Sequence, residues 1–157
     1  MQKKRQKKFD CIYAEESSSI GPLSQREFYM AGLGLFWGEG SKMKDSTLEL
    51  TNTDPAMLRF FIQWCVLGLN IQKTSLRISL HLYNTMNVQN ETNFWSHELG
   101  IPIAQFHRPH IKKSDSGRIY QGGGFGHGTC KVAVYNTKLA RKVLMGIKVI
   151  SNEFVRP

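Results

Sequence analysis

Three segments of the chain alternate between hydrophobic and polar residues, and this period of two predicts β-strands. The segments are residues 47–52, 76–82 and 129–135. In the second of them Leu and Ile occupy every other position, so these side chains should face a core while the residues between them face away. A further strand is predicted over residues 105–112.

Two helices have clear start signals. Ser24 is followed three residues later by Glu27, which is the spacing of a capping box. The apolar segment after it should form a helix that stops at Gly40. Asp54-Pro55 places a capping carboxylate before a proline in the first turn, so a second helix should run from there to about residue 67. This helix is apolar nearly all round and therefore belongs in the core.

Two more helices are predicted in the second half of the chain. Residues 88–99 form one, and Asn136 or Thr137 caps the last. We expect Trp64 and Trp95 to be core residues. One face of the last helix carries apolar side chains at helical spacing, namely Leu139, Val143, Ile147 and Ile150.

Residues 1–19 read as a basic tail, and residues 20–157 as one domain of mixed α+β class. The tail carries five cationic side chains close together: Lys3, Lys4, Arg5, Lys7 and Lys8. Such a block is usually a solvated, flexible arm, and the alternative is that it contacts phosphates. Residues 113–128 are rich in glycine, which predicts a long loop. A nucleotide-binding turn is the weaker interpretation, because the glycines neither follow a strand nor open a helix in the register that binds phosphate.

Charge and composition narrow the class of partner. The 157 residues include 21 Lys and Arg against 12 Asp and Glu, a formal net charge of +9. A positive field of this size favours polyanions, with nucleic acid first among them. No apolar run is long enough to span a membrane, and no N-terminal segment has the pattern of a secretory signal. We therefore expect no membrane partner; an acidic membrane surface is the weaker alternative to nucleic acid, because no basic amphipathic helix stands out. Three scattered cysteines favour an intracellular, reducing compartment.

The segment from Ala31 to Gly40, AGLGLFWGEG, is the most informative. Gly34 and Gly38 lie four residues apart and therefore share one helical face. Each glycine costs a helix about 1 kcal/mol relative to alanine, and close approach of another helix would explain that cost. The alternative is that the two glycines accommodate a core aromatic ring and that Glu39 merely ends an exposed helix.

This segment resembles the signature helix of the LAGLIDADG homing endonucleases, in the variant that ends Gly-Leu-Phe-x-Gly-Glu-Gly. The resemblance extends through the Gly40-Ser41-Lys42 exit, a short strand, Asn52-x-Asp54 before a helix, and Leu69-Asn70-Ile71. It covers residues 24–83 fairly well and residues 84–150 loosely. It implies an α+β fold with a mainly antiparallel sheet and helices packed on one face.

The family resemblance also implies an activity, which is site-specific, metal-dependent hydrolysis of double-stranded DNA. In that family two signature helices pack together, and an acidic residue at the end of each binds a divalent metal. Carried over, Glu39 and the carbonyl of Gly38 would hold metal. Lys42, Lys112 or Lys131 would polarise the phosphate. Only one motif is present, so the chain should form a homodimer on a roughly palindromic site. The interface would consist of Met30, Gly34, Trp37 and Gly38.

Elementary electrostatics agrees with a cation at this place. A helix C-terminus carries partial negative charge, so a carboxylate there is unfavourable. Two such ends brought together would need a counter-charge, and Mg²⁺ suits a few carboxylates plus water and phosphate oxygens.

The chain also departs from the family pattern. Trp37 stands where many members carry a first acidic residue. The segment between Glu39 and Asp54 is too short for a long DNA-reading hairpin, and the helix over residues 88–99 interrupts the later strands. These differences weaken the expectation that the protein recognises DNA bases more than they weaken the expected core fold.

A basic sheet face is predicted independently of the motif. The strand alternation turns Arg77, Ser79, His81 and Lys131 away from the core, and Arg108, His110 and Lys112 share one face of the strand between. Such a face could contact DNA bases and phosphates, although an ordinary solvated face would have the same pattern. Glu49 opposes this charge.

Three alternatives are weaker. The first is a DNA-binding protein of the same fold that lacks cleavage and acts as a regulator or RNA-splicing helper, and the second is a monomeric RNA-binding module. The third is a zinc site, whose residues would be His107, His110, His127 and Cys130, but their spacings do not match structural zinc patterns.

Overall fold

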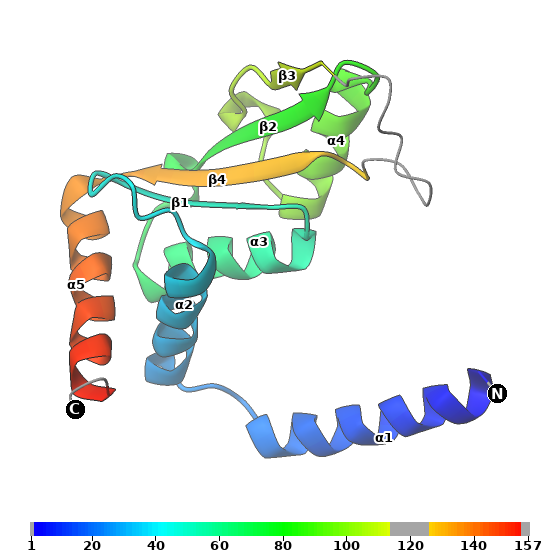
Figure 1. The fold of residues 1–157 in the computed structure, drawn as a ribbon, viewed down its shortest axis with the longest axis vertical. Helices are drawn as coiled ribbons and strands as arrows, with labels where there is room; N and C mark the ends of the chain where they lie inside the picture. The colour runs from blue at the N-terminus through cyan, green and yellow to red at the C-terminus, as the bar shows by residue number, and fades with distance from the viewer. Residues whose placement is uncertain (1, 114–125, 155–157) are drawn as a thin grey trace.

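The computed structural model describes residues 2–113 and 126–154. The long helices and the strands follow one another along the chain, with their bounds, as α1 (Gln2–Ile20), α2 (Gln25–Glu39), β1 (Thr47–Asn52), α3 (Pro55–Gln63), β2 (Arg77–Tyr83), α4 (Val88–Leu99), β3 (His110–Lys112), β4 (Thr129–Tyr135) and α5 (Thr137–Phe154). The strands form one four-stranded sheet in the order β1-β4-β2-β3, and Figure 1 shows it above α2 and α3. The α+β class is therefore confirmed.

The sheet is mixed, with antiparallel pairing in two of its three ladders. β4 lies between β1 and β2 and is antiparallel to both. β3 is a short edge strand that runs parallel to β2, with His81 opposite His110. The last strand in sequence is thus an inner strand of the sheet.

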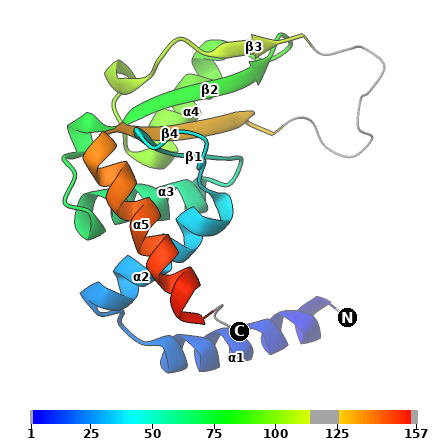
Figure 2. The same cartoon turned by 60° about the vertical axis from the view of Figure 1, so that its left-hand side comes forward.

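One face of the sheet packs on the helices and forms the core. Leu48 and Leu50 of β1, Val132 of β4, and Ile78 and Leu80 of β2 have exposed fractions of 1% or less. Helices α2, α3, α4 and α5 all lie on this side (Figures 1 and 2). Among the described helices none covers the opposite side, which we call the outer face of the sheet. Burying the core residues supplies the main driving force for this arrangement.

Helix starts follow the predicted capping chemistry. Ser24 and Glu27 form a reciprocal capping box at the start of α2. The Asp54 carboxylate accepts a hydrogen bond from the Ala56 N–H, and the Asn136 side chain accepts one from the Leu139 N–H. These contacts satisfy backbone donors that have no partner within their own helix.

The helical bounds agree closely with the pattern. The predicted helix over 88–99 has those bounds, and the helix from residue 55 continues from α3 into a π-helical turn over Trp64–Gly68. Trp64 and Trp95 are fully buried, as expected for core residues. On α5, Val143 and Ile147 are buried and Leu139 and Ile150 pack against the core.

One strand prediction was wrong in extent. Instead of a continuous strand over 105–112, Ile103–Gln105 forms a 3₁₀ turn, Phe106 makes a single bridge to Ile78, and only residues 110–112 pair as β3. The ring of Pro109 fixes the backbone and removes a donor just before β3, which limits the ladder there.

Residues 2–20, which include nearly all of the predicted basic tail, form the helix α1. This helix has no buried residue and projects from the helical side of the domain (Figure 2). Most of the predicted loop over 113–128, namely residues 114–125, lies outside the described residues. Of the helices that are described, none combines the length and apolar character needed to cross a bilayer.

Candidate functional site

The glycines of the α2 segment divide between two environments. A Cβ at Gly32 would overlap the indole ring of Trp64, and one at Gly40 would overlap the Phe36 ring. A Cβ at Gly34 or Gly38 would meet no atom within 4 Å among the described residues outside the adjoining turns of α2 itself. The core aromatic rings therefore pack against Gly32 and Gly40, and the alternative explanation of Gly34 and Gly38 as core contacts is wrong.

Gly34 and Gly38 lie on an exposed face of α2 that also carries two large apolar side chains. Met30 is 40% exposed and Trp37 is 41% exposed. We call these four residues the open face of α2. Large apolar side chains are costly to leave in water, and two open glycines beside them allow the close approach of another backbone.

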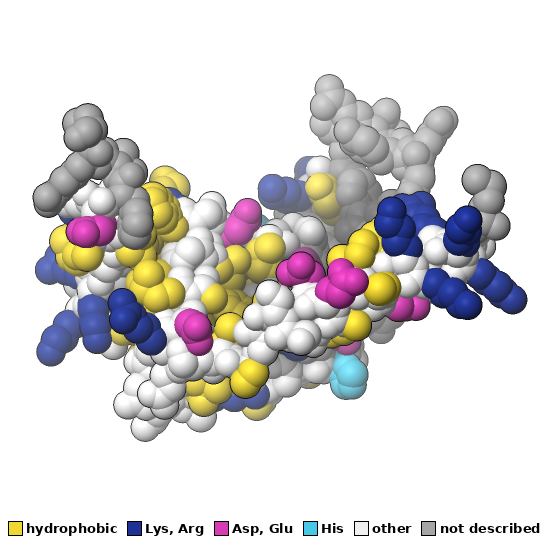
Figure 3. All heavy atoms as spheres, turned by 90° about the horizontal axis from the view of Figure 1, so that it is seen from below, with side chains coloured by type: hydrophobic (Ala, Val, Ile, Leu, Met, Phe, Trp, Pro, Cys, Tyr) yellow, Lys and Arg dark blue, Asp and Glu magenta, His cyan; other side chains and the backbone are white. Residues whose placement is uncertain are grey.

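Helix α5 packs against α2 next to this face. A Cβ at Gly146 would make ordinary contact with Leu33, at 3.5 Å, which shows how closely the two helices approach. The outer side of α5 carries the exposed Met145 and Val149. Figure 3 shows apolar side chains over α2 and α5, and Lys and Arg gathered at the far end of α1.

The C-terminal end of α2 reaches the sheet at β1. Gly40 bridges to Leu50, and the Ser41 N–H donates to the Glu49 carbonyl at 2.9 Å. Glu39, the last residue of the helix, is exposed. The predicted metal ligand therefore lies at the level of the sheet, at the end of the open face of α2.

Lys42 caps the C-terminus of α2. Its ammonium group donates hydrogen bonds to the carbonyls of Trp37, at 2.8 Å, and Gly40, at 2.7 Å. A cation at this place offsets the negative end of the helix dipole. Lys42 is thus close to Glu39 in the chain, as its predicted role requires, but its ammonium is engaged with backbone oxygens.

The chain supplies one carboxylate, that of Glu39, to the predicted metal site. Glu39 and nearby carbonyls are hard oxygen donors of the kind that Mg²⁺ accepts, so the donor chemistry fits. Within the described parts of one chain, no three His, Cys, Asp or Glu side chains gather as a metal-binding group. A site of two carboxylates would need a second copy of α2.

The two other candidate lysines are placed differently relative to Glu39. Lys131 lies on β4, the neighbour of β1. Lys112 lies on β3 at the opposite edge, three strand spacings or roughly 14 Å from β1. Within one protomer, the structure does not bring Lys112 to the end of α2.

Most predicted DNA-binding residues share the outer face of the sheet. The pairing places Ser79 opposite Lys131, His81 opposite His110, and Tyr83 opposite Lys112. Arg108 is exposed in the segment that precedes β3, and does not itself belong to a strand. Ser79 is only 8% exposed and so offers little surface to a ligand.

Local contacts reduce the positive potential of this face. The Lys131 ammonium lies 3.5 Å from the Glu49 carboxylate, and both side chains are 25% exposed. The Arg77 guanidinium donates to the carbonyls of Thr74 and Leu76, each at 2.8 Å. The positive charge in the middle of the outer face therefore depends on the ionisable side chains around His81.

His81 and His110 stack on each other there. Their ring centroids lie 5.0 Å apart and the planes differ by 18°. Partial burial lowers the pKa of His81, and the positive fields of His110, Lys131 and Lys112 lower it further. Desolvation and like charge both disfavour the imidazolium form.

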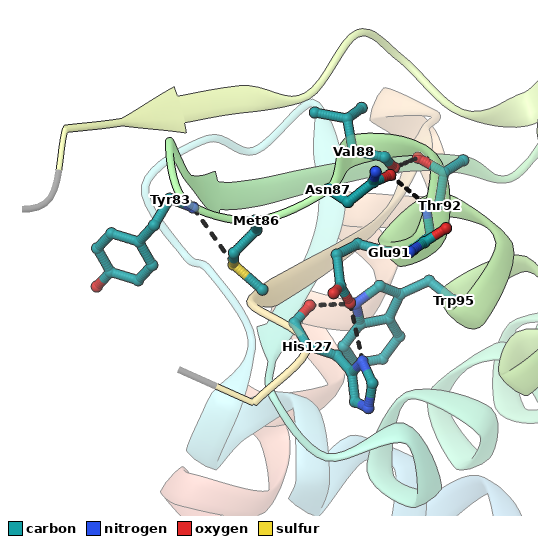
Figure 4. Close-up of polar contacts among 9 residues, drawn as sticks. Tyr83, Met86, Asn87, Val88, Glu91, Thr92, Trp95 and His127 are labelled. Atoms are coloured by element: carbon teal, nitrogen blue, oxygen red, sulfur yellow. Dashed lines mark hydrogen bonds and ion pairs between the residues drawn. The ribbon is translucent and has the colours of Figure 1, made fainter. Parts of the chain in front are cut away.

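The zinc alternative is not supported by the positions of its residues. Cys130 is buried on the core face of β4, where burial raises the pKa of its thiol. The His127 ring stacks on Phe94 and its Nδ1 lies 2.8 Å from the Glu91 carboxylate. Figure 4 shows this contact beside the Trp95 indole, which donates to the His127 carbonyl.

The sequence reasoning missed several of these contacts. Gly32 belongs to the same motif as Gly34, and only the phase of the helix relative to Trp64 separates their roles. Lys42 as a cap could have been suspected, because a cation just after a helix end is favourable. The Glu91–His127 pair spans 36 positions and has no local signal.

Comparisons of the chain with protein-family models, with curated proteins and with solved structures find no match.

Proposed function

We propose that this protein is a metal-dependent DNA endonuclease that acts as a homodimer, similar to single-motif LAGLIDADG enzymes. The observation that carries the proposal is the open face of α2. Among the residues that the structure describes, no side chain packs against Gly34 or Gly38, and the face ends at the exposed Glu39. A second copy of α2 would fill both glycine positions and bring a second Glu39 to the same place.

A homodimer explains the cost of the two open glycines. Each destabilises an isolated helix by about 1 kcal/mol relative to alanine. Close helix packing around a two-fold axis recovers this cost by burying Met30 and Trp37 against the partner. It also sets the outer faces of two sheets side by side, at the level of the two Glu39 carboxylates.

In the proposed reaction, the C-terminal end of α2 supplies the metal ligand, and the sheet supplies the contact to phosphate. When bound between two Glu39 side chains, Mg²⁺ would activate water and stabilise the leaving oxygen of a phosphodiester. Glu39 would hold the cation, and Lys131, on the strand next to β1, is better placed than Lys112 to contact the phosphate beside Glu39. Lys42 would keep the helix end in position through its two hydrogen bonds to carbonyls.

The dimer is tested by filling the open glycines. We expect Gly34→Leu and Gly38→Leu to convert a dimer into a monomer in sedimentation equilibrium. Asn90→Leu is the matched control, because it adds the same side chain to an exposed position of α4. A wild-type protein that stays monomeric at high micromolar concentration, with and without DNA, would contradict the proposal.

Cleavage is tested with a library of DNA duplexes and Mg²⁺. Cuts made by wild type should vanish with Glu39→Gln and persist with Glu153→Gln, which removes an exposed carboxylate near the end of α5. Cuts that survive Glu39→Gln would exclude Glu39 as the metal ligand.

A second candidate is a DNA-binding homodimer of this fold that does not cleave. The engagement of the Lys42 ammonium with the Trp37 and Gly40 carbonyls favours it, since a catalytic lysine needs to reach phosphate. Selective DNA binding without cuts by either wild type or Glu39→Gln would support this candidate.

A further inference from the structure

The stacked imidazoles of His81 and His110 lie at the junction of β2 and β3 on the outer face of the sheet. Every strand near them contributes a charged or titratable group. These groups are Lys131 on β4, Glu49 on β1, Lys112 on β3, and Arg77 and Tyr83 on β2 itself.

The fixed charges do not leave this place strongly positive. Lys131 is paired with Glu49, and Arg77 is folded onto backbone carbonyls. Lys112 is exposed at the edge of the sheet beside the pair. A polyanion on this face would therefore meet the Lys112 ammonium, which makes no ion pair within the described part of the chain, and the two imidazole rings.

The two rings lie close enough for their charges to interact. Positive charge on His110 disfavours the charged form of His81, because like charges this close repel. Partial burial and the adjacent lysines lower the pKa of His81 in the unbound protein. A phosphate group placed against the rings reverses this balance, since an anion favours the charged form of each imidazole and accepts hydrogen bonds from it.

We propose that His81 and His110, with Lys112, form a binding site for a backbone phosphate of DNA that takes up a proton together with the phosphate. This inference rests on the proposed function and deepens it, because it assigns one contact of the sheet face and its dependence on pH. The proton comes from solvent and leaves again on release, so no covalent bond changes.

The proposal has a measurable consequence for affinity. A rise of one unit in the pKa of one imidazole on binding corresponds to a tenfold gain in affinity at acidic over alkaline pH. We therefore expect wild type to bind a 20-base-pair duplex of arbitrary sequence about tenfold more tightly at pH 5.5 than at pH 8, at constant salt. An arbitrary sequence keeps the test independent of any target site.

The matched variants are the double variant His81→Gln/His110→Gln and the control His97→Gln. Glutamine keeps the polarity of the side chain without its charge in this pH range. His97 lies on α4, on the opposite side of the sheet, and its side chain is 89% exposed. The double variant should lose most of the pH dependence, and the control should keep it.

Calorimetry gives a second measurement that does not depend on comparing affinities across pH. In buffers of different ionisation enthalpy near pH 7, wild type should take up about half a proton for each bound site, which is the most that a one-unit rise in one pKa can give. The double variant should take up close to none.

The outcomes separate the two claims. DNA binding that is equally tight at both pH values, or a double variant with unchanged pH dependence, would overturn this inference and leave the proposed function standing. Failure of wild type to bind DNA at any pH would overturn both. If the double variant shows no cooperative unfolding transition, the single variants His81→Gln and His110→Gln replace it. Their proton uptake on DNA binding is measured by the same calorimetry.

Discussion

Gly32 lies directly against the indole ring of Trp64, and the Trp64 Nε1–H donates to the Tyr29 carbonyl at 3.1 Å. The ring is fully buried and is thereby held in one position. Two residues further along the same helix, Gly34 faces open space. Adjacent glycines of one motif thus have opposite structural roles, one inside the fold and one on its surface.

This contrast predicts opposite effects of alanine at the two positions. Gly32→Ala should lower the free energy of unfolding by about 2 kcal/mol, because the buried Trp64 ring has to move to admit a methyl group. Gly34→Ala should raise it by about 1 kcal/mol in the monomer, because alanine is the better helix former. Urea unfolding at concentrations where the protein is monomeric measures both. Equal effects of the two substitutions would contradict the placement of α2.

Removal of the Lys42 ammonium should destabilise the end of α2. Lys42→Met keeps the aliphatic stem but loses two hydrogen bonds to carbonyls, so we expect a loss of about 1 kcal/mol of stability. Lys44→Met is the matched control, an exposed lysine of the same loop. Should both variants unfold at the same urea concentration as wild type, Lys42 does not act as a cap.

The stability of the protein should depend on pH through His81. Its pKa is lower in the folded state than the ordinary value near 6.5, so folding favours the neutral ring. The resulting stability is present above pH 6.5 and is lost as the pH falls through the folded pKa. His81→Gln should therefore show a smaller fall in stability between pH 7 and pH 5 than wild type. His107→Gln, an exposed histidine before β3, should behave like wild type in the same thermal unfolding experiment.

The basic residues of α1 lie on the opposite side of the domain from the outer face of the sheet (Figure 1). A short duplex bound to that face should not reach them. Replacing Lys3, Lys4, Arg5, Lys7 and Lys8 by Gln should then change the slope of log K against log salt by less than Lys112→Gln alone, which should reduce it by about 0.9. A reduction of several units with the α1 variant would instead place α1 on the DNA.

The sequence was informative wherever a signal is local. Alternation predicted the bounds of β1 and β4 to the residue, because the large apolar side chains of each strand are buried against helices on one side, while the residues between them belong to the outer face. The Ser24 capping box and the Asp54 cap defined two helix starts, since such contacts involve residues three or fewer positions apart.

Features that depend on residues far apart in the chain could not be predicted from such local patterns. Parallel pairing of β3 with β2 depends on the path of residues 100–109, which includes the Ile103–Gln105 turn. The stacking of His81 on His110 follows from that pairing, so the pattern could place both residues on a face but not against each other. The choice between Gly32 and Gly34 as the buried glycine likewise needed the position of Trp64.

The place of β4 in the sheet constrains the order in which this protein can assemble. β1 pairs with β4 among the described strands, and β2 needs β4 for its antiparallel partner, so residues 129–135 must be available before the sheet can close. On the ribosome, a nascent chain that has emerged only as far as α4 would hold two strands, β1 and β2, whose partners in the sheet are still missing. Both would be open to association with other chains until the last strand arrives between them.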